Sequence, residues 1–164
     1  MNISDYYSKF GFICTPLNDK VPIIKKWNTY TTTKQIDLNK YNIGVLTGKS
    51  SNITVLDIDI KDNGLLLWKR LISLYPDINT PIVKTPSGGL HYYFLYTDIK
   101  SFSKIKIKNK KIGWDLLNDG RQAVLPPSIS KTNKKKYKWI QDIETVKIQK
   151  IPEWLYNYLT IYNN

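Results

Sequence analysis

Two aspartates stand two residues apart in the apolar stretch Val55-Leu56-Asp57-Ile58-Asp59-Ile60. The branched apolar residues around them favour a buried β-strand. Because successive strand side chains point to opposite faces, we expect Asp57 and Asp59 on one face and residues 56, 58 and 60 on the other, in the core. Adjacent carboxylates repel each other and are costly to desolvate, and divalent cations would offset that cost. The stretch predicts either a metal-binding carboxylate pair or a half-exposed strand with two aspartates on its polar face.

A second candidate site is the turn Ser87-Gly88-Gly89, which leads to His91, the only histidine. Adjacent glycines allow a tight turn that brings backbone N–H groups close to a ligand. The Ser87 hydroxyl and the imidazole can donate hydrogen bonds to phosphate oxygens. The alternative is a plain glycine hairpin whose histidine bonds to its neighbours.

A third carboxylate, Asp115, interrupts another apolar stretch. Arg121 follows a glycine turn, and its fork of donors could reach a phosphate. Asp119 lies within that turn, between asparagine and glycine, which favours a turn role for it. Asp115 is therefore the third candidate carboxylate, and Arg121 a further candidate phosphate ligand.

The composition points to an anionic partner. The 164 residues carry 25 Lys plus Arg against 13 Asp plus Glu, a formal net charge of +12. This excess favours nucleic acid or nucleotides as partners. No apolar run could span a bilayer and no signal-peptide pattern opens the chain, so we expect a cytoplasmic protein with no membrane partner. Cys14 is the only cysteine, which excludes an intrachain disulfide and argues against a zinc site.

Turn and periodicity signals divide the chain into short strands and a few helices. Strands are expected over 12–14, 42–47, 55–60, 82–85, 90–96, 104–108, 112–116, 122–125 and 137–140, and helices over 4–10, 32–38, 62–75 and 152–162. Asn118-Asp119-Gly120 predicts a hairpin between the strands on either side of it. The result is a mixed α/β (α+β) layout: a largely antiparallel sheet with the aspartate strand in its centre and helices packed on it.

Taken in order, these motifs resemble the primase–polymerase domains of the archaeo-eukaryotic primase superfamily, found in plasmid, phage and viral replication proteins. The Asp-x-Asp strand of that family is matched by residues 57–59, its small-residue turn before a histidine by 87–91, and its apolar residue before an aspartate by 114–115. The Pro-Pro-Ser turn at 126–128, Lys20-Val21-Pro22 with Trp27, and the stretch 42–48 also fit. Each motif is weak alone, whereas the ordered set covers nearly the whole chain and is fairly specific. Gly89 departs from the pattern, because many members have serine two residues before the histidine.

The resemblance implies an RNA-recognition-like catalytic core and template-directed nucleotidyl transfer, as a DNA primase, a DNA polymerase or both. It implies that Asp57, Asp59 and Asp115 hold two Mg²⁺ or Mn²⁺ ions. It also implies that His91, Ser87 and the amides of the glycine turn (Gly88 and Gly89) bind the nucleotide triphosphate, with Arg121 as a helper.

The implied partners are a DNA template, in single-stranded form, NTPs or dNTPs, and a replicative helicase domain or protein. Residues 1–164 would form one domain, alone or as the N-terminal part of a larger replication protein. Template phosphates would be tracked by Lys104, Lys106 and Lys108, which alternate along one expected strand, and by the lysine-rich region 131–138. The alternative for these lysines is a solvated edge that suppresses aggregation.

Three other functions fit parts of the sequence. Asp59-Ile60-Lys61 matches the Asp-x-Lys part of a metal-dependent nuclease core, but Asp37 is the only upstream acid nearby. A rolling-circle initiator typically uses two metal-binding histidines, and this chain has one. A non-catalytic module that binds single-stranded nucleic acid would stack bases on aromatic residues, without needing three aspartates on apolar strands.

Overall fold

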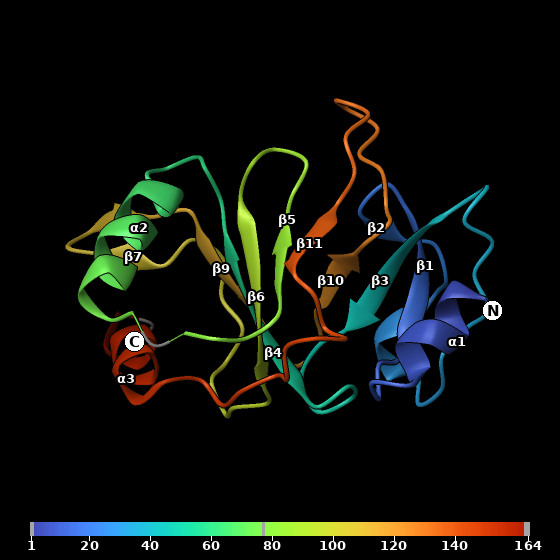
Figure 1. The fold of residues 1–164 in the computed structure, drawn as a ribbon, viewed down its shortest axis with the longest axis horizontal. Helices are drawn as coiled ribbons and strands as arrows, with labels where there is room; N and C mark the ends of the chain where they lie inside the picture. The colour runs from blue at the N-terminus through green and yellow to red at the C-terminus, as the bar shows by residue number, and fades with distance from the viewer. Residues whose placement is uncertain (1, 77, 163–164) are drawn as a thin grey trace.

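A computed structural model of the chain describes residues 2–76 and 78–162. Its larger sheet has the strand order β11-β5-β6-β4-β9, and every neighbouring pair is antiparallel. The aspartate strand β4 lies inside this sheet, between β6 and β9, as the sequence predicts (Figure 1). The bounds are β4 (Ile53–Ile58), β5 (Ile82–Lys84), β6 (Leu90–Leu95), β9 (Trp114–Leu117) and β11 (Lys138–Gln141).

A second antiparallel sheet has the order β10-β3-β1-β2. A single bridge between Gly48 and Ile53 marks the place where the chain passes from this sheet to the larger one. Its strands are β1 (Cys14–Asn18), β2 (Val21–Pro22), β3 (Asn42–Leu46) and β10 (Gln122–Leu125), and a separate ribbon pairs β7 (Lys106–Ile107) with β8 (Lys110–Lys111). Antiparallel sheets combined with packed helices confirm the predicted α+β class.

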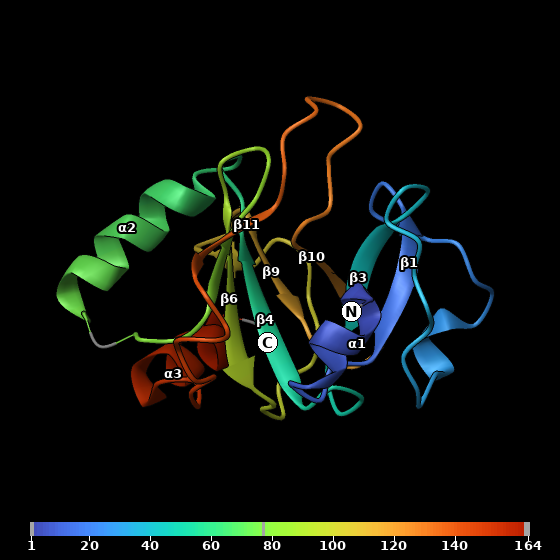
Figure 2. The same cartoon turned by 45° about the vertical axis from the view of Figure 1, so that its right-hand side comes forward.

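Helices α2 (Gly64–Leu74) and α3 (Glu153–Tyr162) cover one face of the larger sheet (Figures 1 and 2). Trp68 of α2 is fully buried and meets Trp114 edge-on, with ring centroids 5.6 Å apart. Leu56 and Ile58 of β4 point into this core, and burying each such side chain stabilises the fold by about 1.5–3 kcal/mol. Of the helices in the described residues, none is long and apolar enough to cross a membrane.

The opposite face of the larger sheet packs against the second sheet. Val55, Val83 and Tyr93 from the larger sheet share one buried cluster with Val45 and Ala123 from the second. Helix α1 (Ile3–Ser8) packs at the edge of this cluster, and the short 3₁₀ helix η1 (Trp27–Thr29) follows β2 in the chain. Farther along the same face of β4 the apolar residues give way to polar ones, and the candidate site begins there.

The hairpin predicted around Asn118-Asp119-Gly120 is wrong. Strand β9 pairs with β4 in the larger sheet, whereas β10 pairs with β3 in the second. The buried Asn118 side chain donates to the carbonyl oxygens of Thr97 and Ile99 and accepts from the Thr54 hydroxyl. These long-range bonds hold the segment in which the chain crosses between sheets, and a local turn signal carries no information about them.

Several expected boundaries also need correction. The helix expected over 32–38 does not form; instead, the Thr33 hydroxyl donates to the Phe12 carbonyl oxygen and accepts from the Cys14 N–H. The strand expected at 12–14 starts only at Cys14. The helix expected over 4–10 spans Ile3–Ser8 and is capped by Asn2, whose Oδ1 accepts from the Ser4 N–H.

The basic strand expected over 104–108 is reduced to the two residues of β7. Lys108 and Asn109 have φ angles of +50° and +62° and form the turn of the β7–β8 ribbon, while Lys104 also has a positive φ, of +52°. Ile60, which was expected in the core, lies beyond the end of β4 and is 45 % exposed. Both β4 and β7 therefore end earlier than the alternation of their side chains in the sequence predicts.

Candidate active site

Three candidate residues stand side by side across the larger sheet. Asp57 of β4 lies directly opposite His91 of β6 on one side and Asp115 of β9 on the other. Opposite residues in an antiparallel pair project from the same face, with Cβ atoms about 4.5–5.5 Å apart. The strand register thus brings one residue from each of three sequence motifs into a single row.

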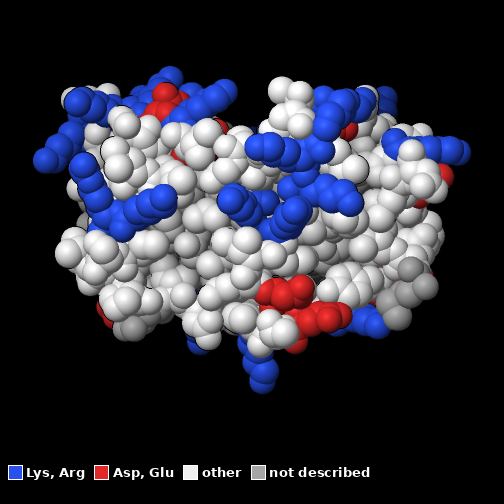
Figure 3. All heavy atoms as spheres, turned by 45° about the horizontal axis from the view of Figure 1, so that its top comes forward, with Lys and Arg blue, Asp and Glu red and all other residues white. Residues whose placement is uncertain are grey.

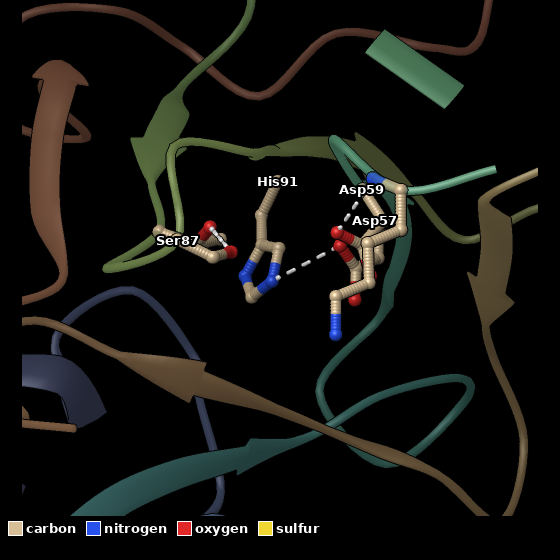
Figure 4. A network of polar contacts seen from close by, with 6 residues as sticks. Asp57, Asp59, Ser87 and His91 are labelled. Carbon is tan, nitrogen blue, oxygen red and sulfur yellow. Dashed lines mark hydrogen bonds and ion pairs between the residues drawn. The ribbon is translucent and has the colours of Figure 1, made fainter. Parts of the chain in front are cut away.

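Asp59 lies just past the end of β4. Its N–H donates to the Gly113 carbonyl oxygen at 2.7 Å, and its Oδ1 accepts from the Lys61 N–H at 3.3 Å. Gly113 permits this close approach, because a Cβ there would lie 2.3 Å from the Lys61 carbonyl oxygen. Figure 4 shows Asp59 beside Asp57, with both carboxylates on the same side of His91.

His91 is buried between Asp57 and Ser87 (Figure 4). Its Nε2 lies 3.5 Å from Asp57 Oδ1, and its ring centroid lies 6.0 Å from that of Tyr137. The other ring nitrogen, Nδ1, is buried on the Ser87 side with no hydrogen-bond partner among the described residues. A buried polar atom without a partner costs about 1–3 kcal/mol, and an oxygen of a bound ligand would recover it.

The glycine turn before His91 approaches β4 closely. The Gly88 N–H donates to the Thr85 carbonyl oxygen at 3.0 Å, and Gly88 has a φ of +98°, which favours glycine. A Cβ on Gly89 would lie 2.4 Å from the Ile58 carbonyl oxygen. In this backbone, a serine at position 89 would therefore clash with the end of β4. Because the Gly88 N–H is committed to the turn, the Ser87 hydroxyl, 3.1 Å from the Thr85 hydroxyl, is the clearer phosphate ligand.

A cavity of about 360 Å³ lies between the two sheets beside this row. Asp57, Asp59 and His91 line it from the larger sheet, and the Ser87 turn lies beside them. Residues Gln122 to Val124 of β10 line it from the second sheet. The other lining residues are Lys20, Lys61, Thr85, Pro86, Leu117, Ser130, Thr132, Asn133 and Tyr137. The cavity therefore combines carboxylates, an imidazole, hydroxyls and lysines, which can hold a cation and a chain of phosphates together.

Asp115 is close to the other two carboxylates but does not line the cavity. Its Oδ1 accepts from the Lys104 N–H at 2.8 Å. Burial raises the pKa of the Asp115 carboxyl above its ordinary value, and the charges of Asp57 and Asp59 raise that pKa further. Asp115 therefore experiences the repulsion expected of a carboxylate placed beside two others.

These carboxylates suit a divalent cation without forming a closed ligand cluster. Within residues 2–76 and 78–162, no group of three or more His, Cys, Asp or Glu side chains is spaced to hold a metal ion. Carboxylate oxygens are nevertheless the ligands that Mg²⁺ and Mn²⁺ prefer, and a cation would relieve the repulsion felt by Asp115. Asp57 and Asp59 lie side by side at the cavity, and the hydrogen bond from the Lys104 N–H uses only one of the two Asp115 oxygens.

The candidate phosphate ligand Arg121 and the turn residue Asp119 both lie outside the cavity. Arg121 is exposed and is not among the lining residues. Asp119 accepts from the Lys49 N–H at 2.8 Å and from the Tyr96 hydroxyl at 3.2 Å, so its carboxylate ties this turn to two segments that are distant in the sequence. Of the lysines expected to follow the template, Lys104 forms an ion pair with Asp62 at 2.7 Å. Lys106 and Lys108 are exposed on the β7–β8 ribbon.

Several residues that line the cavity belong to none of the three motifs and are not predicted as site residues from the sequence. Gln122 of β10 donates from Nε2 to the Lys20 carbonyl oxygen at 2.9 Å, and its buried Oε1 has no partner among the described residues. Lys20 lies in the turn between β1 and β2, and Tyr137 stands one residue before β11. The Lys20-Val21-Pro22 stretch was recognised without a role, while nothing local distinguishes Gln122 or Tyr137, because only the packing of the two sheets places them.

The comparison with protein families agrees with this geometry. A family model described as "Bifunctional DNA primase/polymerase, N-terminal" matches residues 4–154, a span that contains every strand of both sheets. No curated protein matches the chain. The matched span also contains the carboxylates, the glycine turn and His91. The chain therefore belongs to the family of bifunctional DNA primase/polymerase N-terminal domains.

Proposed function

We propose that the cavity between the two sheets catalyses template-directed nucleotidyl transfer, as a DNA primase, a DNA polymerase or both, in the replication of a virus, phage or plasmid. The observation that carries the proposal is the row of Asp57, His91 and Asp115, with Asp59 beside it and the Ser87 turn next to the imidazole. Family membership supports a primase or polymerase activity in general.

Asp57 and Asp59 would hold Mg²⁺ or Mn²⁺, with Asp115 as a third ligand through the oxygen that does not accept from Lys104. A bound pair of such ions lowers the pKa of an attacking 3′-hydroxyl and neutralises charge on the leaving pyrophosphate. The protein itself mainly positions the reactants and excludes water, which is the usual division of labour in phosphoryl transfer.

His91 and Ser87 would bind the triphosphate. The buried Nδ1 of His91 is the atom that needs a partner, and the Ser87 hydroxyl lies on that side of the ring. Asp57, at 3.5 Å from Nε2, orients the imidazole. The incoming nucleotide would thus be held with its phosphates between the glycine turn and the carboxylates. Lys20 and Lys61 line the same cavity and add positive charge.

The test is an assay with a single-stranded template, labelled nucleotides and either Mg²⁺ or Mn²⁺, run with and without a primer. Asp57→Asn and Asp59→Asn should each abolish synthesis, because an amide neither carries the charge nor offers the second oxygen that the metal needs. Asp115→Asn should act similarly.

Asp119→Asn is the matched control, since that carboxylate lies outside the cavity and accepts hydrogen bonds from the Lys49 N–H and the Tyr96 hydroxyl, neither of which lines the cavity. It should remain close to wild type. Near-normal synthesis by the Asp57 and Asp59 variants with both metals would exclude the proposed metal site. Cleavage of the template without synthesis would assign a nuclease, and binding alone would assign a non-catalytic module.

A further inference from the structure

A second hollow lies on the far side of the glycine turn from the carboxylates. Its volume is about 600 Å³, and its walls are residues 85–88 of the turn and five lysines: Lys84, Lys134, Lys135, Lys136 and Lys138. Among the described residues, no Asp or Glu lines it. We refer to this hollow as the lysine groove. It shares Thr85, Pro86 and Ser87 with the catalytic cavity, so the two hollows flank one turn.

The loop that carries most of these lysines is held beside the turn. Asn133 donates from Nδ2 to the Pro86 carbonyl oxygen at 2.9 Å, and the Ser130 N–H donates to the Lys135 carbonyl oxygen at 2.9 Å. Figures 1 and 2 both show the β10–β11 loop rising next to the β5–β6 turn at one end of the molecule. The groove is therefore a formed feature of the fold.

The charges in the groove are not compensated by ion pairs within the part of the chain that the structure describes. All five lysines are exposed, and among the described residues none of them has an acidic side chain within 4.0 Å. Lys84 and Lys138 lie directly opposite each other in the β5–β11 pair, an arrangement in which like charges destabilise a sheet. A phosphate placed between them would remove that repulsion. Figure 3 shows how Lys and Arg side chains gather on this side of the molecule.

We propose that the lysine groove binds the phosphate backbone of a single-stranded nucleic acid, and that this strand is the template on its way to the cavity. The identification as template rests on the proposed function; the binding of a strand does not. Flexible, exposed lysines suit backbone tracking without sequence readout. Lys136 and Lys138 lie two residues apart in extended chain, about 6–7 Å, which is comparable with successive phosphates of a stretched strand. A dedicated pyrophosphate site would instead call for buried donors or an arginine fork, and the groove has neither.

The test compares two triple variants that each lower the net charge from +12 to +9. The groove variant carries Lys84→Ala, Lys136→Ala and Lys138→Ala. The matched control carries Lys9→Ala, Lys69→Ala and Lys147→Ala, three exposed lysines that line no hollow described above. Both are checked for folding by circular dichroism, and a second groove variant with glutamine in place of alanine guards against a packing effect.

Binding of fluorescein-labelled oligo(dT) is followed by anisotropy across a salt series, without metal or nucleotide. The groove variants should reduce the magnitude of the log–log salt slope by about 2, from roughly 0.7 for each lost contact, while the control keeps the wild-type slope. An oligonucleotide of unrelated sequence should behave in the same way.

Equal slopes in wild type, groove variants and control would overturn the proposal, as would an equal loss in groove variants and control. An unchanged slope combined with weaker binding of added pyrophosphate by the groove variants would also overturn it and would assign the groove to the leaving group. Because no catalysis is measured, the result is independent of the proposed function. A wild-type protein that binds through the groove but never synthesises would refute the polymerase and leave the groove as a nucleic-acid site.

Discussion

The imidazole of His91 stands between an acid and a hydroxyl, with one ring nitrogen buried and unpartnered. If Nδ1 donates to a phosphate oxygen, His91→Ala removes one hydrogen bond to a charged group, which is worth about 1.5–3 kcal/mol. We therefore expect a rise in the nucleotide KM of roughly 10- to 150-fold. A nucleotide titration at saturating template measures this change directly.

His91→Asn is a matched variant that keeps a short donor at the same position, and it should recover part of the affinity. Template affinity, measured separately by anisotropy, should change little in either variant. An unchanged KM in His91→Ala would make the histidine a packing residue beside Tyr137 rather than a phosphate ligand.

The residue types of the site could be predicted from the sequence, but their arrangement could not. The spacing of Asp57 and Asp59 predicts that they share a side, and Figure 4 shows that they do. Which residues stand opposite Asp57 depends on strand register, which is set by pairing over many residues. The hydrogen bond from the Lys104 N–H to Asp115 could not be predicted from the sequence either, because it depends on a loop in which Lys104 has a positive φ angle.

The β7–β8 ribbon illustrates the same limit for an element. Alternating lysines predict a strand with one basic face, yet the chain turns at Lys108 and ties Lys104 to Asp62. At most two of the three predicted lysines, Lys106 and Lys108, remain available to a template. Turn signals are read from a few neighbouring residues, and they show that the chain reverses without showing which strand it joins next.

Because Lys104 is paired with Asp62, the structure predicts a smaller loss of salt dependence on mutation of these three lysines than the sequence alone does. Replacing Lys104, Lys106 and Lys108 together by alanine should reduce the salt slope for single-stranded template by no more than about 1.4, from two contacts of roughly 0.7 each. The measurement is the anisotropy series used for the lysine groove. A reduction of about 2 would mean that Lys104 exchanges Asp62 for a phosphate when nucleic acid binds.

Across the whole molecule, buried thiol and phenol groups make stability depend on alkaline pH. Burial raises the pKa of Cys14 to about 12 from 9.0, and raises the pKa of Tyr93 well above 10.0. At a pH between the ordinary pKa of these groups and their raised pKa in the folded protein, the unfolded chain binds fewer protons than the folded one. The free energy of unfolding therefore falls as the pH rises above about 9, and this contribution is fully present below that pH.

Tyr93→Phe tests this linkage with little structural disturbance, because the Tyr93 hydroxyl is buried with no partner among the described residues. Denaturant unfolding should show a shallower alkaline loss in the variant, by up to about 1.4 kcal/mol per pH unit. Lysine titration affects both proteins equally and cancels in the comparison. Parallel curves for the two proteins would show that Tyr93 ionises without opposing the fold.

The catalytic cavity has its carboxylates on one sheet and Gln122 to Val124 on the other. The second sheet contributes no acid to the cavity, yet its buried cluster with Val55, Val83 and Tyr93 fixes how far it stands from the first. The packing of the hydrophobic core between the two sheets therefore sets the distance between the sheets, and with it the width of the cavity. Enlarging or shrinking a core side chain between the sheets would change which nucleotides fit, although that side chain touches no substrate.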